Sequence, residues 1–282
     1  METEQLKSLI FSGERENIRI AIHIAKSLKI SLEGLIAGLG YGNFGLSRPI
    51  DFIGLESIRC SQYNSKYLHL LPALVHLKTL FLNACKLSDI SPLAQIYTLQ
   101  TLDLSFNQLQ TIQPLQQLIG LHTLYLQNNQ LIDLRPLLLL VQLQTLNLND
   151  NKIEQLAGLE KLRMLKDLRC NSNKIKQIDA LVGLQSLEHL EIWDNQIQDL
   201  SSLQNLTSLK YLDVSYNNIS NINVLENLQN LEYLDLRKNP NLQDIRPLLA
   251  LPNLKKCYLD WSSLPSETRE TFRKQHPKCE LD

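Results

Sequence analysis

The most constraining feature of the sequence is a 22-residue repeat with the pattern LxxLxLxxNxIxxIxxLxxLxx, which runs from Leu55 to Asn253. A leucine opens every repeat, and successive opening leucines lie 22 residues apart except for one final step of 23. The extra residue belongs to the Pro240-Asn241 pair, whose residue types favour a turn. A period of this length predicts a solenoid, in which each repeat forms one coil and buries its apolar residues by stacking on its neighbours.

Positions four and six of each repeat predict a short strand, because apolar residues alternate there, as at Leu102 and Leu104. Later apolar residues, such as Ile112 and Leu115, have helix-like spacing and are expected to turn inward from the other side of the coil. An asparagine holds position nine of most repeats, where its amide is predicted to bond the backbone of neighbouring coils. These residues are Asn107, Asn129, Asn151, Asn173, Asn195, Asn217 and Asn239.

The segments Asp89-Ile90-Ser91-Pro92-Leu93 and Asp244-Ile245-Arg246-Pro247-Leu248 place a proline in the first turn of a short 3₁₀-like segment. With this motif and this period, the sequence resembles the 22-residue class of leucine-rich repeats found in bacterial internalins and in phosphatase-regulatory repeat proteins. The resemblance covers about 200 of 282 residues. It implies an arc-shaped α/β solenoid with a parallel sheet on its concave side and short 3₁₀ or irregular segments on its convex side. It also implies protein binding on the concave sheet, and we expect a bacterial origin.

Both ends of an open stack need capping structure, and the sequence predicts three regions accordingly. Residues 1–54 are predicted to form a helical N-terminal cap, with an independent interaction module as the alternative. Residues 55–253 form nine leucine-rich repeats, and residues 254–282 contain the tenth strand and a C-terminal cap. The expected N-terminal helices cover residues 3–11, 14–29 and 31–39.

The C-terminal cap is predicted to consist of one helix and one strand. Pro265 begins the helix, which is expected to cover residues 266–275. Cys279-Glu280-Leu281 can add a last edge strand beyond it.

Charge and composition narrow the functional classes. The formal net charge of -1 gives no overall electrostatic reason to bind nucleic acid or an anionic membrane. The first residues, Met1 to Lys7, carry acids where a secretory signal needs bases, and no apolar run approaches the length of about 20 residues that spans a bilayer. We therefore expect a cytoplasmic protein, and a monomer.

The five cysteines match neither a zinc motif nor a small disulfide framework. Cys60, Cys85, Cys170 and Cys257 occupy inward-facing repeat positions and are interpreted as small core residues. A bridge between Cys257 and Cys279 is disfavoured by the reducing cytoplasm that we expect.

No motif in the chain indicates catalysis. Residues 40–45 fit GxGxxG, but this segment follows a helix pattern instead of a strand, so it is interpreted as a connector. We therefore expect no enzyme activity, no cofactor and no metal.

The concave surface, formed by positions three, five and seven with position eight just beyond, differs between the two halves of the solenoid. The early repeats carry small polar residues at position three, such as Thr101 and Thr123. The later repeats carry aromatic and acidic residues, which are enriched in protein-binding sites. We predict that a partner contacts His189, Glu191, Trp193, Asp194, Tyr211, Asp213, Tyr216, Tyr233, Asp235, Tyr258, Asp260 and Trp261.

Glu191, Asp213 and Asp235 form an acidic column at position five of consecutive repeats, with strands about 4.8 Å apart. In a structural interpretation, Arg169 and Arg237 offset the repulsion between the three carboxylates. In a functional interpretation, the column receives Lys or Arg from a partner, and the aromatic rings add apolar or cation-π contact. The residue pattern supports both, while calcium binding is a lesser option because a flat sheet rarely offers six oxygens.

The sequence therefore predicts a noncatalytic protein-interaction module whose unknown partner has a basic or apolar surface. A glycan or cell-surface recognition module is the alternative, since stacked Tyr and Trp beside Asp can also bind sugar rings. An enzyme in the N-terminal helices is a third hypothesis, and it would need a pocket with a perturbed acid-base pair.

Overall fold

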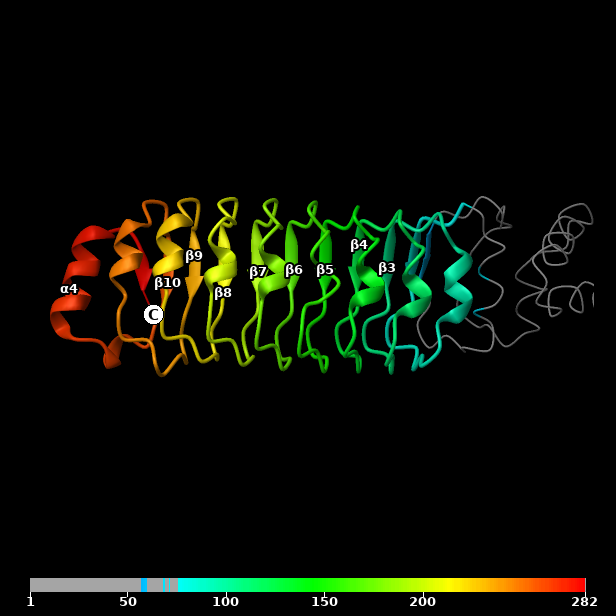
Figure 1. The fold of residues 1–282 in the computed structure, drawn as a ribbon, viewed down its shortest axis with the longest axis horizontal. Coiled ribbons are helices and arrows are strands. Elements are labelled where there is room, and N and C mark those ends of the chain that lie inside the picture. The colour runs from blue at the N-terminus through cyan, green and yellow to red at the C-terminus, as the bar shows by residue number, and fades with distance from the viewer. Residues whose placement is uncertain (1–56, 60–67, 69–70, 72–75, 282) are drawn as a thin grey trace, which may run out of the picture.

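The computed structural model describes residues 57–59, 68, 71 and 76–281 of the chain. Its coils stack side by side in one row (Figure 1) and share one 11-stranded sheet, in which the strands follow their order in the sequence and pair in parallel. The strands are β1 (Ser57–Arg59), β2 (Thr79–Phe81), β3 (Thr101–Asp103), β4 (Thr123–Tyr125), β5 (Thr145–Asn147), β6 (Asp167–Arg169), β7 (His189–Glu191), β8 (Tyr211–Asp213), β9 (Tyr233–Asp235), β10 (Lys256–Tyr258) and β11 (Glu280–Leu281). The predicted parallel solenoid is confirmed, whereas the N-terminal helices expected over 3–11, 14–29 and 31–39 lie outside the described residues.

The repeat sets the strand register. Within β3 the side chain of Leu102 is buried, while Thr101 and Asp103 are half-buried on the solvent side. Leu102 pairs with Leu124 of β4, so residues at the same repeat position become neighbours across the sheet. The alternating pattern thus divides each strand between the core and one solvent-facing surface, which we call the sheet face.

A second layer of short 3₁₀ helices lies in front of the sheet in Figure 1. These helices are η3 (Ser91–Gln95), η4 (Gln113–Leu115), η5 (Arg135–Leu137), η6 (Asp179–Leu181), η7 (Ser201–Leu203), η8 (Asn223–Asn227), η9 (Arg246–Ala250) and η10 (Trp261–Ser263). Proline occupies the first turn of η3, η4, η5 and η9, where its fixed φ suits the turn. None of the helices in the described part of the chain has the length and apolarity to cross a membrane.

The core lies between the two layers and consists almost entirely of leucine and isoleucine. The position-nine asparagines close each coil at one edge. Asn129 accepts a hydrogen bond from the amide of Leu109 at 3.0 Å and donates to the carbonyls of Leu104 and Leu126, each at 3.0 Å. Since Asn129 bridges two coils in this way, the predicted structural role of the asparagines is confirmed.

The C-terminal cap matches the predicted order of helix and strand. Helix α4 (Ser266–Gln275) follows Pro265, and β11 pairs in parallel with β10. The side chain of Phe272 on α4 is fully buried, and the His276 ring bonds the carbonyl of Leu248 at 3.1 Å. These two contacts fix the helix over the last coils.

The cysteines of the described residues are free thiols. Cys85, Cys170 and Cys257 are buried, which confirms their interpretation as core residues, and Cys257 forms no bridge to Cys279. Burial raises the pKa of the Cys257 thiol well above its ordinary value. Cys60 lies outside the described residues.

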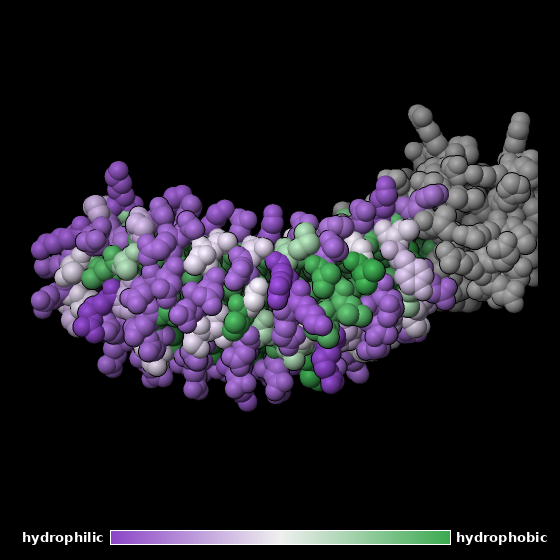
Figure 2. Space-filling model, turned by 45° about the horizontal axis from the view of Figure 1, so that its top comes forward, coloured by the Kyte–Doolittle hydropathy of each residue, from purple (hydrophilic) through white to green (hydrophobic). Residues whose placement is uncertain are grey.

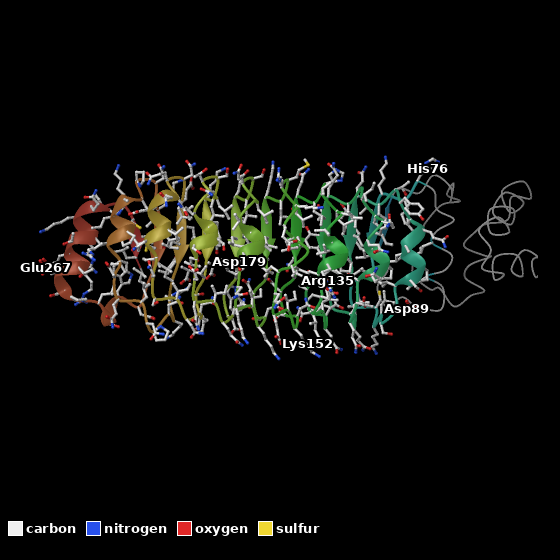
Figure 3. The ribbon with its side chains drawn as sticks, in the orientation of Figure 1. His76, Asp89, Arg135, Lys152, Asp179 and Glu267 are labelled. Atoms are coloured by element: carbon white, nitrogen blue, oxygen red, sulfur yellow. The ribbon has the colours of Figure 1, made fainter. Side chains whose placement is uncertain are left out.

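The two long edges of the row have different surfaces. Figure 3 places His76 on one edge and Lys152 on the opposite edge, where the position-nine asparagines also lie. The surface is mostly hydrophilic, with a cluster of hydrophobic side chains in the half of the row nearer the N-terminus (Figure 2).

Candidate functional site

The candidate site is the part of the sheet face formed by β7, β8, β9 and β10. Position three of the first three of these strands carries a column of rings. The His189 and Tyr211 rings stack with centroids 4.1 Å apart and planes inclined by 15°, and the Tyr211 and Tyr233 rings stack at 4.0 Å and 7°. Tyr258 joins from position five, with its centroid 5.4 Å from that of Tyr233 and its ring tilted. We call these four side chains the ring column.

The ring column is rigid because its members cover one another. Both faces of Tyr211 are occupied, one by His189 and the other by Tyr233. Burial raises the pKa of both tyrosines above the ordinary phenol value, so their hydroxyls stay protonated at neutral pH. What the column offers a ligand is a row of ring edges and hydroxyl groups.

Glu191 lies beside the ring column and is tied to its neighbours. It contacts Nε2 of His189 at 2.6 Å and accepts a hydrogen bond from the side-chain amide of Asn171 at 2.9 Å. The Arg169 guanidinium lies 3.7 Å away. These bonds, the one to His189 first, hold the pKa of Glu191 below its ordinary value despite partial burial.

Asp235, at the other end of the acidic column, is also compensated. Its side chain is buried and forms an ion pair with Arg237 of the same coil, with Nε 3.1 Å from each carboxylate oxygen. The Arg237 guanidinium lies 4.8 Å from the centroid of the Tyr258 ring. This arginine therefore links the acidic column to the ring column through a cation-π contact.

Asp213, between these two acids, differs from both. It accepts hydrogen bonds from the amide and the hydroxyl of Ser215 at 3.0 and 2.7 Å, but among the described residues no cationic side chain forms an ion pair with it. Burial raises its pKa, and the carboxylates of Asp235 and Glu191 add to the shift. The structural interpretation of the column thus holds for its two ends, while its middle acid lacks a cation.

The remaining predicted site residues follow the strands at positions seven and eight. Trp193 is half-buried, and Asp194 and Tyr216 are exposed. Asp194 and Tyr216 have φ values of 55° and 52°, in the left-handed region that residues with a β-carbon rarely adopt. Every described coil from Ala84 to Lys238 repeats this conformation at position eight. The fold therefore imposes the conformation and turns the Tyr216 ring out beside the sheet face.

The last two predicted residues belong to the cap. Asp260 accepts a hydrogen bond from the amide of Lys238 at 2.8 Å and so joins the last two coils. Trp261 packs against the core, with its ring centroid 5.1 Å from that of Phe272 on α4. Position eight of this coil begins η10 instead of continuing the repeated turn, and this is why Trp261 does not extend the surface formed by Trp193 and Tyr216.

A chain of hydrogen bonds that was not predicted from the sequence runs along the sheet face at position seven. The side chain of Asn149 accepts a hydrogen bond from the backbone amide of Asn171 at 2.8 Å. The side chain of Asn171 in turn accepts one from the backbone amide of Trp193 at 3.1 Å. Asn171 also donates to Glu191, so this chain orients both Trp193 and the acidic column. The recurrence of Asn at position seven of adjacent repeats is the sequence feature that could have indicated this chain of hydrogen bonds.

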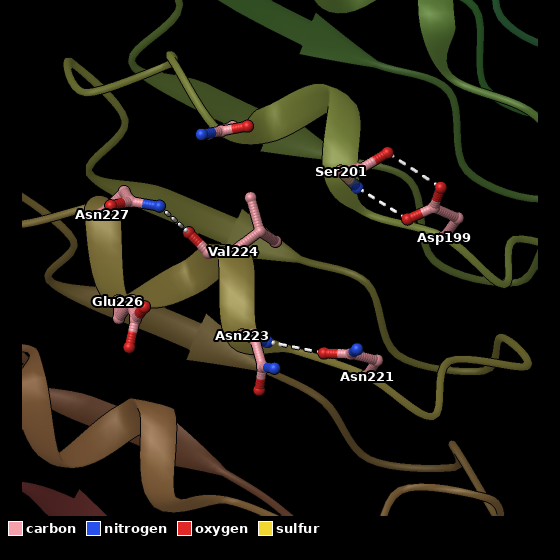
Figure 4. A pocket seen from close by; sticks show the side chains of 8 residues that line it. Asp199, Ser201, Asn221, Asn223, Val224, Glu226 and Asn227 are labelled. Carbon is pink, nitrogen blue, oxygen red and sulfur yellow. Dashed lines mark hydrogen bonds between the residues drawn. The ribbon is translucent and has the colours of Figure 1, made fainter.

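An open pocket of about 300 Å³ lies on the opposite layer, between η7 and η8 (Figure 4). The polar side chains that line this pocket form hydrogen bonds within the local turns. Asp199 accepts from the amide and the hydroxyl of Ser201, each at 2.8 Å, and Asn221 accepts from the amide of Asn223 at 2.9 Å. Within the described ranges, no group of three or more His, Cys, Asp or Glu is placed to hold a metal ion.

Comparisons with known proteins agree with this geometry. A family model described as leucine-rich repeats in two copies matches residues 97–139 and 185–227. No curated protein matches the sequence. Among solved structures, an internalin (inlF) from Listeria monocytogenes is similar, with 25% identity, a TM-score of 0.73, and coverage of 88% of this chain and 86% of that chain.

Two further structures have the same architecture. A leucine-rich-repeat protein from Leptospira interrogans shows 26% identity and a TM-score of 0.68, covering 81% of this chain and 72% of that chain. Internalin C2 from Listeria monocytogenes shows 27% identity and a TM-score of 0.64, covering 79% of this chain and 89% of that chain. The chain therefore contains leucine-rich repeats, and its solenoid is similar to those of the internalins.

Proposed function

We propose that this protein is a noncatalytic protein-interaction module whose partner binds the C-terminal half of the sheet face. The observation that carries the proposal is the ring column, in which the stacked rings of His189, Tyr211 and Tyr233 hold one another rigid. Rigid aromatic side chains lose little conformational entropy on binding and are enriched among residues that dominate interface energies. Leucine-rich-repeat proteins generally bind other proteins, and this supports the assignment.

The acidic column specifies the partner further. Glu191 and Asp235 already have cationic or hydrogen-bonding neighbours, so a partner gains little by pairing with them. Asp213 is half-buried between them and lacks a cation within the described residues. We infer that the partner presents one basic side chain toward Asp213 and a mainly apolar surface toward the rings.

The ring column also argues against the glycan alternative. Sugars stack on aromatic faces, but both faces of Tyr211 are covered by its neighbours. Catalysis is disfavoured because no Ser, Thr or Cys side chain bonds the His189–Glu191 pair in the described site. The bacterial origin, the cytoplasmic location and the monomeric state stay predictions.

The test compares matched aromatic substitutions in a pull-down from the native host lysate. Trp193→Ala/Tyr216→Ala changes the proposed site, whereas Phe106→Ala/Tyr125→Ala changes two aromatic residues of earlier coils. The two pairs match in exposure, since Trp193 and Tyr125 are half-buried and the other two side chains are exposed. Phe106 and Tyr216 make a close pair, since both are 55% exposed in the left-handed conformation of position eight. Proteins bound by the wild type are identified by mass spectrometry and purified for affinity measurements.

We expect the first variant to lose at least about tenfold in affinity, because a hot-spot aromatic side chain contributes about 2 kcal/mol or more. The second variant should bind like the wild type. Equal affinity in all three proteins, or equal loss in both variants, would remove the C-terminal half of the sheet face as the binding site.

A further inference from the structure

A row of exposed apolar side chains follows one edge of the solenoid, away from the sheet face. Tyr97, Ile119 and Val141 occupy position 21 of three consecutive coils, and Leu139 and Met164 lie beside them at positions 19 and 22. All five are classed as exposed, with exposed fractions from 40% for Val141 to 57% for Tyr97 and Ile119. Figure 2 shows hydrophobic side chains gathered on this part of the surface. We call these five residues the edge row.

The fold does not require apolar residues in the edge row. Position 21 of the later coils holds Gln185, Thr207 and Gln229, and the core beneath those residues is equally closed. Comparison with these later coils shows that a polar residue at position 21 is compatible with the same fold. Exposed aliphatic side chains add little stability and promote association, so a contiguous row of them indicates a contact surface.

The edge row is bordered by positive charge. Position 21 continues with Arg163 and position 19 with Lys161, and both side chains are exposed. At positions 19 to 22 and position 2, the edge carries no Asp or Glu between Lys78 and Lys166. Among the described residues, neither Lys161 nor Arg163 forms an ion pair. The adjacent acid Glu160 instead accepts a hydrogen bond from the Gly158 amide at 2.8 Å.

The spacing of the coils fits one kind of ligand well. Neighbouring strands in a sheet lie about 4.8 Å apart, while an α-helix advances about 5.4 Å per turn. A helix lying along the row would therefore place one turn against each coil, over Tyr97, Ile119 and Val141 in succession. Its negative end would then meet Lys161 and Arg163.

We propose that the edge row docks an amphipathic helix of a partner protein, with apolar residues on one face and acidic residues in its last turn. The helix runs along the solenoid with its C-terminal end toward Arg163. Leucines at helical spacing fill the row, and the glutamates pair with the two basic side chains. The surface is separate from the sheet face, so both can be occupied together.

The test uses a synthetic helix as the probe. The peptide has about 18 residues, long enough to form a helix, with leucines along one face, glutamates in the last turn and a fluorescent label at its N-terminus. Fluorescence anisotropy measures its affinity for the full chain. Two further peptides serve as controls: one has lysines in place of the glutamates, and one has the leucines scrambled.

The variant Ile119→Gln/Val141→Thr gives the row residue types that the later coils carry, and Gln185→Ala/Gln229→Ala changes the same position outside the row. We expect the acidic peptide to lose at least about tenfold in affinity in the first variant and to bind the second variant like the wild type. Arg163→Gln should reduce the preference for the glutamate peptide over the lysine peptide. Circular dichroism and thermal melting check that each variant is folded.

Several outcomes would overturn the proposal. One is no binding of the acidic peptide to the wild type, and another is equal binding of the scrambled peptide. Unchanged affinity in folded Ile119→Gln/Val141→Thr would also contradict it. Binding to phosphatidylserine vesicles without binding to the peptide would assign the edge row to a membrane surface. Dimerisation of the wild type that the variant abolishes would assign the row to a second copy of the chain.

Discussion

At the scale of single residues, Glu191 and Asp213 show how two carboxylates at the same repeat position acquire opposite properties. They are direct neighbours in the register of β7 and β8. Glu191 receives bonds from His189 and Asn171, which lower its pKa, whereas burial and adjacent carboxylates raise the pKa of Asp213. The difference arises from their neighbours, since both side chains emerge from the same face of the sheet.

This contrast predicts opposite effects of neutralising each acid. Glu191→Gln should destabilise the protein by about 1–2 kcal/mol at neutral pH, because it replaces the acceptor of charge-assisted hydrogen bonds. Since the folded pKa of Glu191 is lowered, its stabilisation is present above the unfolded pKa and is lost as the pH falls through the folded pKa. The difference between wild type and variant should therefore shrink in acid.

Asp213→Asn should raise the free energy of unfolding at neutral pH by about 0.2–1 kcal/mol, because it removes repulsion between adjacent carboxylates. The folded pKa of Asp213 is raised, so the wild type loses stability as the pH rises from the unfolded to the folded pKa. Urea denaturation from about pH 2 to pH 8 measures both variants, with the exposed Asp194→Asn as control. The same sign for Glu191→Gln and Asp213→Asn would contradict this account.

The sequence alone could predict which residues share the sheet face, because a strict period makes equal positions neighbours. It placed Glu191, Asp213 and Asp235 in one column, as observed. It could not predict that His189 both bonds Glu191 and stacks on Tyr211, since that depends on the side-chain torsions chosen in the folded state. Nor could it distinguish Asp213 from its neighbours, because the sequence does not show which carboxylate of the column Arg237 reaches. In the structure Arg237 pairs with Asp235 of its own coil.

At the scale of elements, the coil between η5 and η6 differs from its neighbours on the side opposite the sheet. It has no 3₁₀ helix and forms an isolated bridge between Gln155 and Gln177. Gly158 replaces the residue that is proline in several other coils, and its φ is +115°. Glycine marks this coil in the sequence, because the coils of η6, η7 and η8 also lack proline at this position and still form 3₁₀ helices. Only the structure shows how closely Gly158 approaches the coil before it.

Gly158→Ala should be among the most destabilising single substitutions in the chain. A β-carbon there would lie 2.3 Å from the carbonyl oxygen of Leu134, and the backbone conformation itself disfavours any residue but glycine. We expect a loss of about 3 kcal/mol in the free energy of unfolding, measured by urea denaturation. Gly183→Ala is the matched control, because the nearest neighbour of its β-carbon would be the carbonyl oxygen of Glu160 at 3.7 Å. Similar stability of the two variants would contradict the close approach of the coils.

At the scale of the whole molecule, the contacts between the described elements join successive coils. The stability of the solenoid is therefore close to a sum of coil and interface contributions. The sequence could predict the order of elements in the C-terminal cap from the proline at 265 and the apolar spacing. It could not predict that Trp261 turns toward Phe272, because the repeat assigns that position to a surface turn.

Because the described elements contact those of adjacent coils, a defect in the cap should stay local. Phe272 is the one fully buried side chain of α4, and Phe272→Ala should cost about 3–5 kcal/mol, enough to undock the helix. Hydrogen exchange should then rise in α4, β11 and β10, while the coils around β3 to β6 keep their protection. Arg273→Ala, an exposed neighbour on the same helix, should leave exchange unchanged. A uniform rise in exchange from β2 to β11 would instead show that the solenoid unfolds as one cooperative unit.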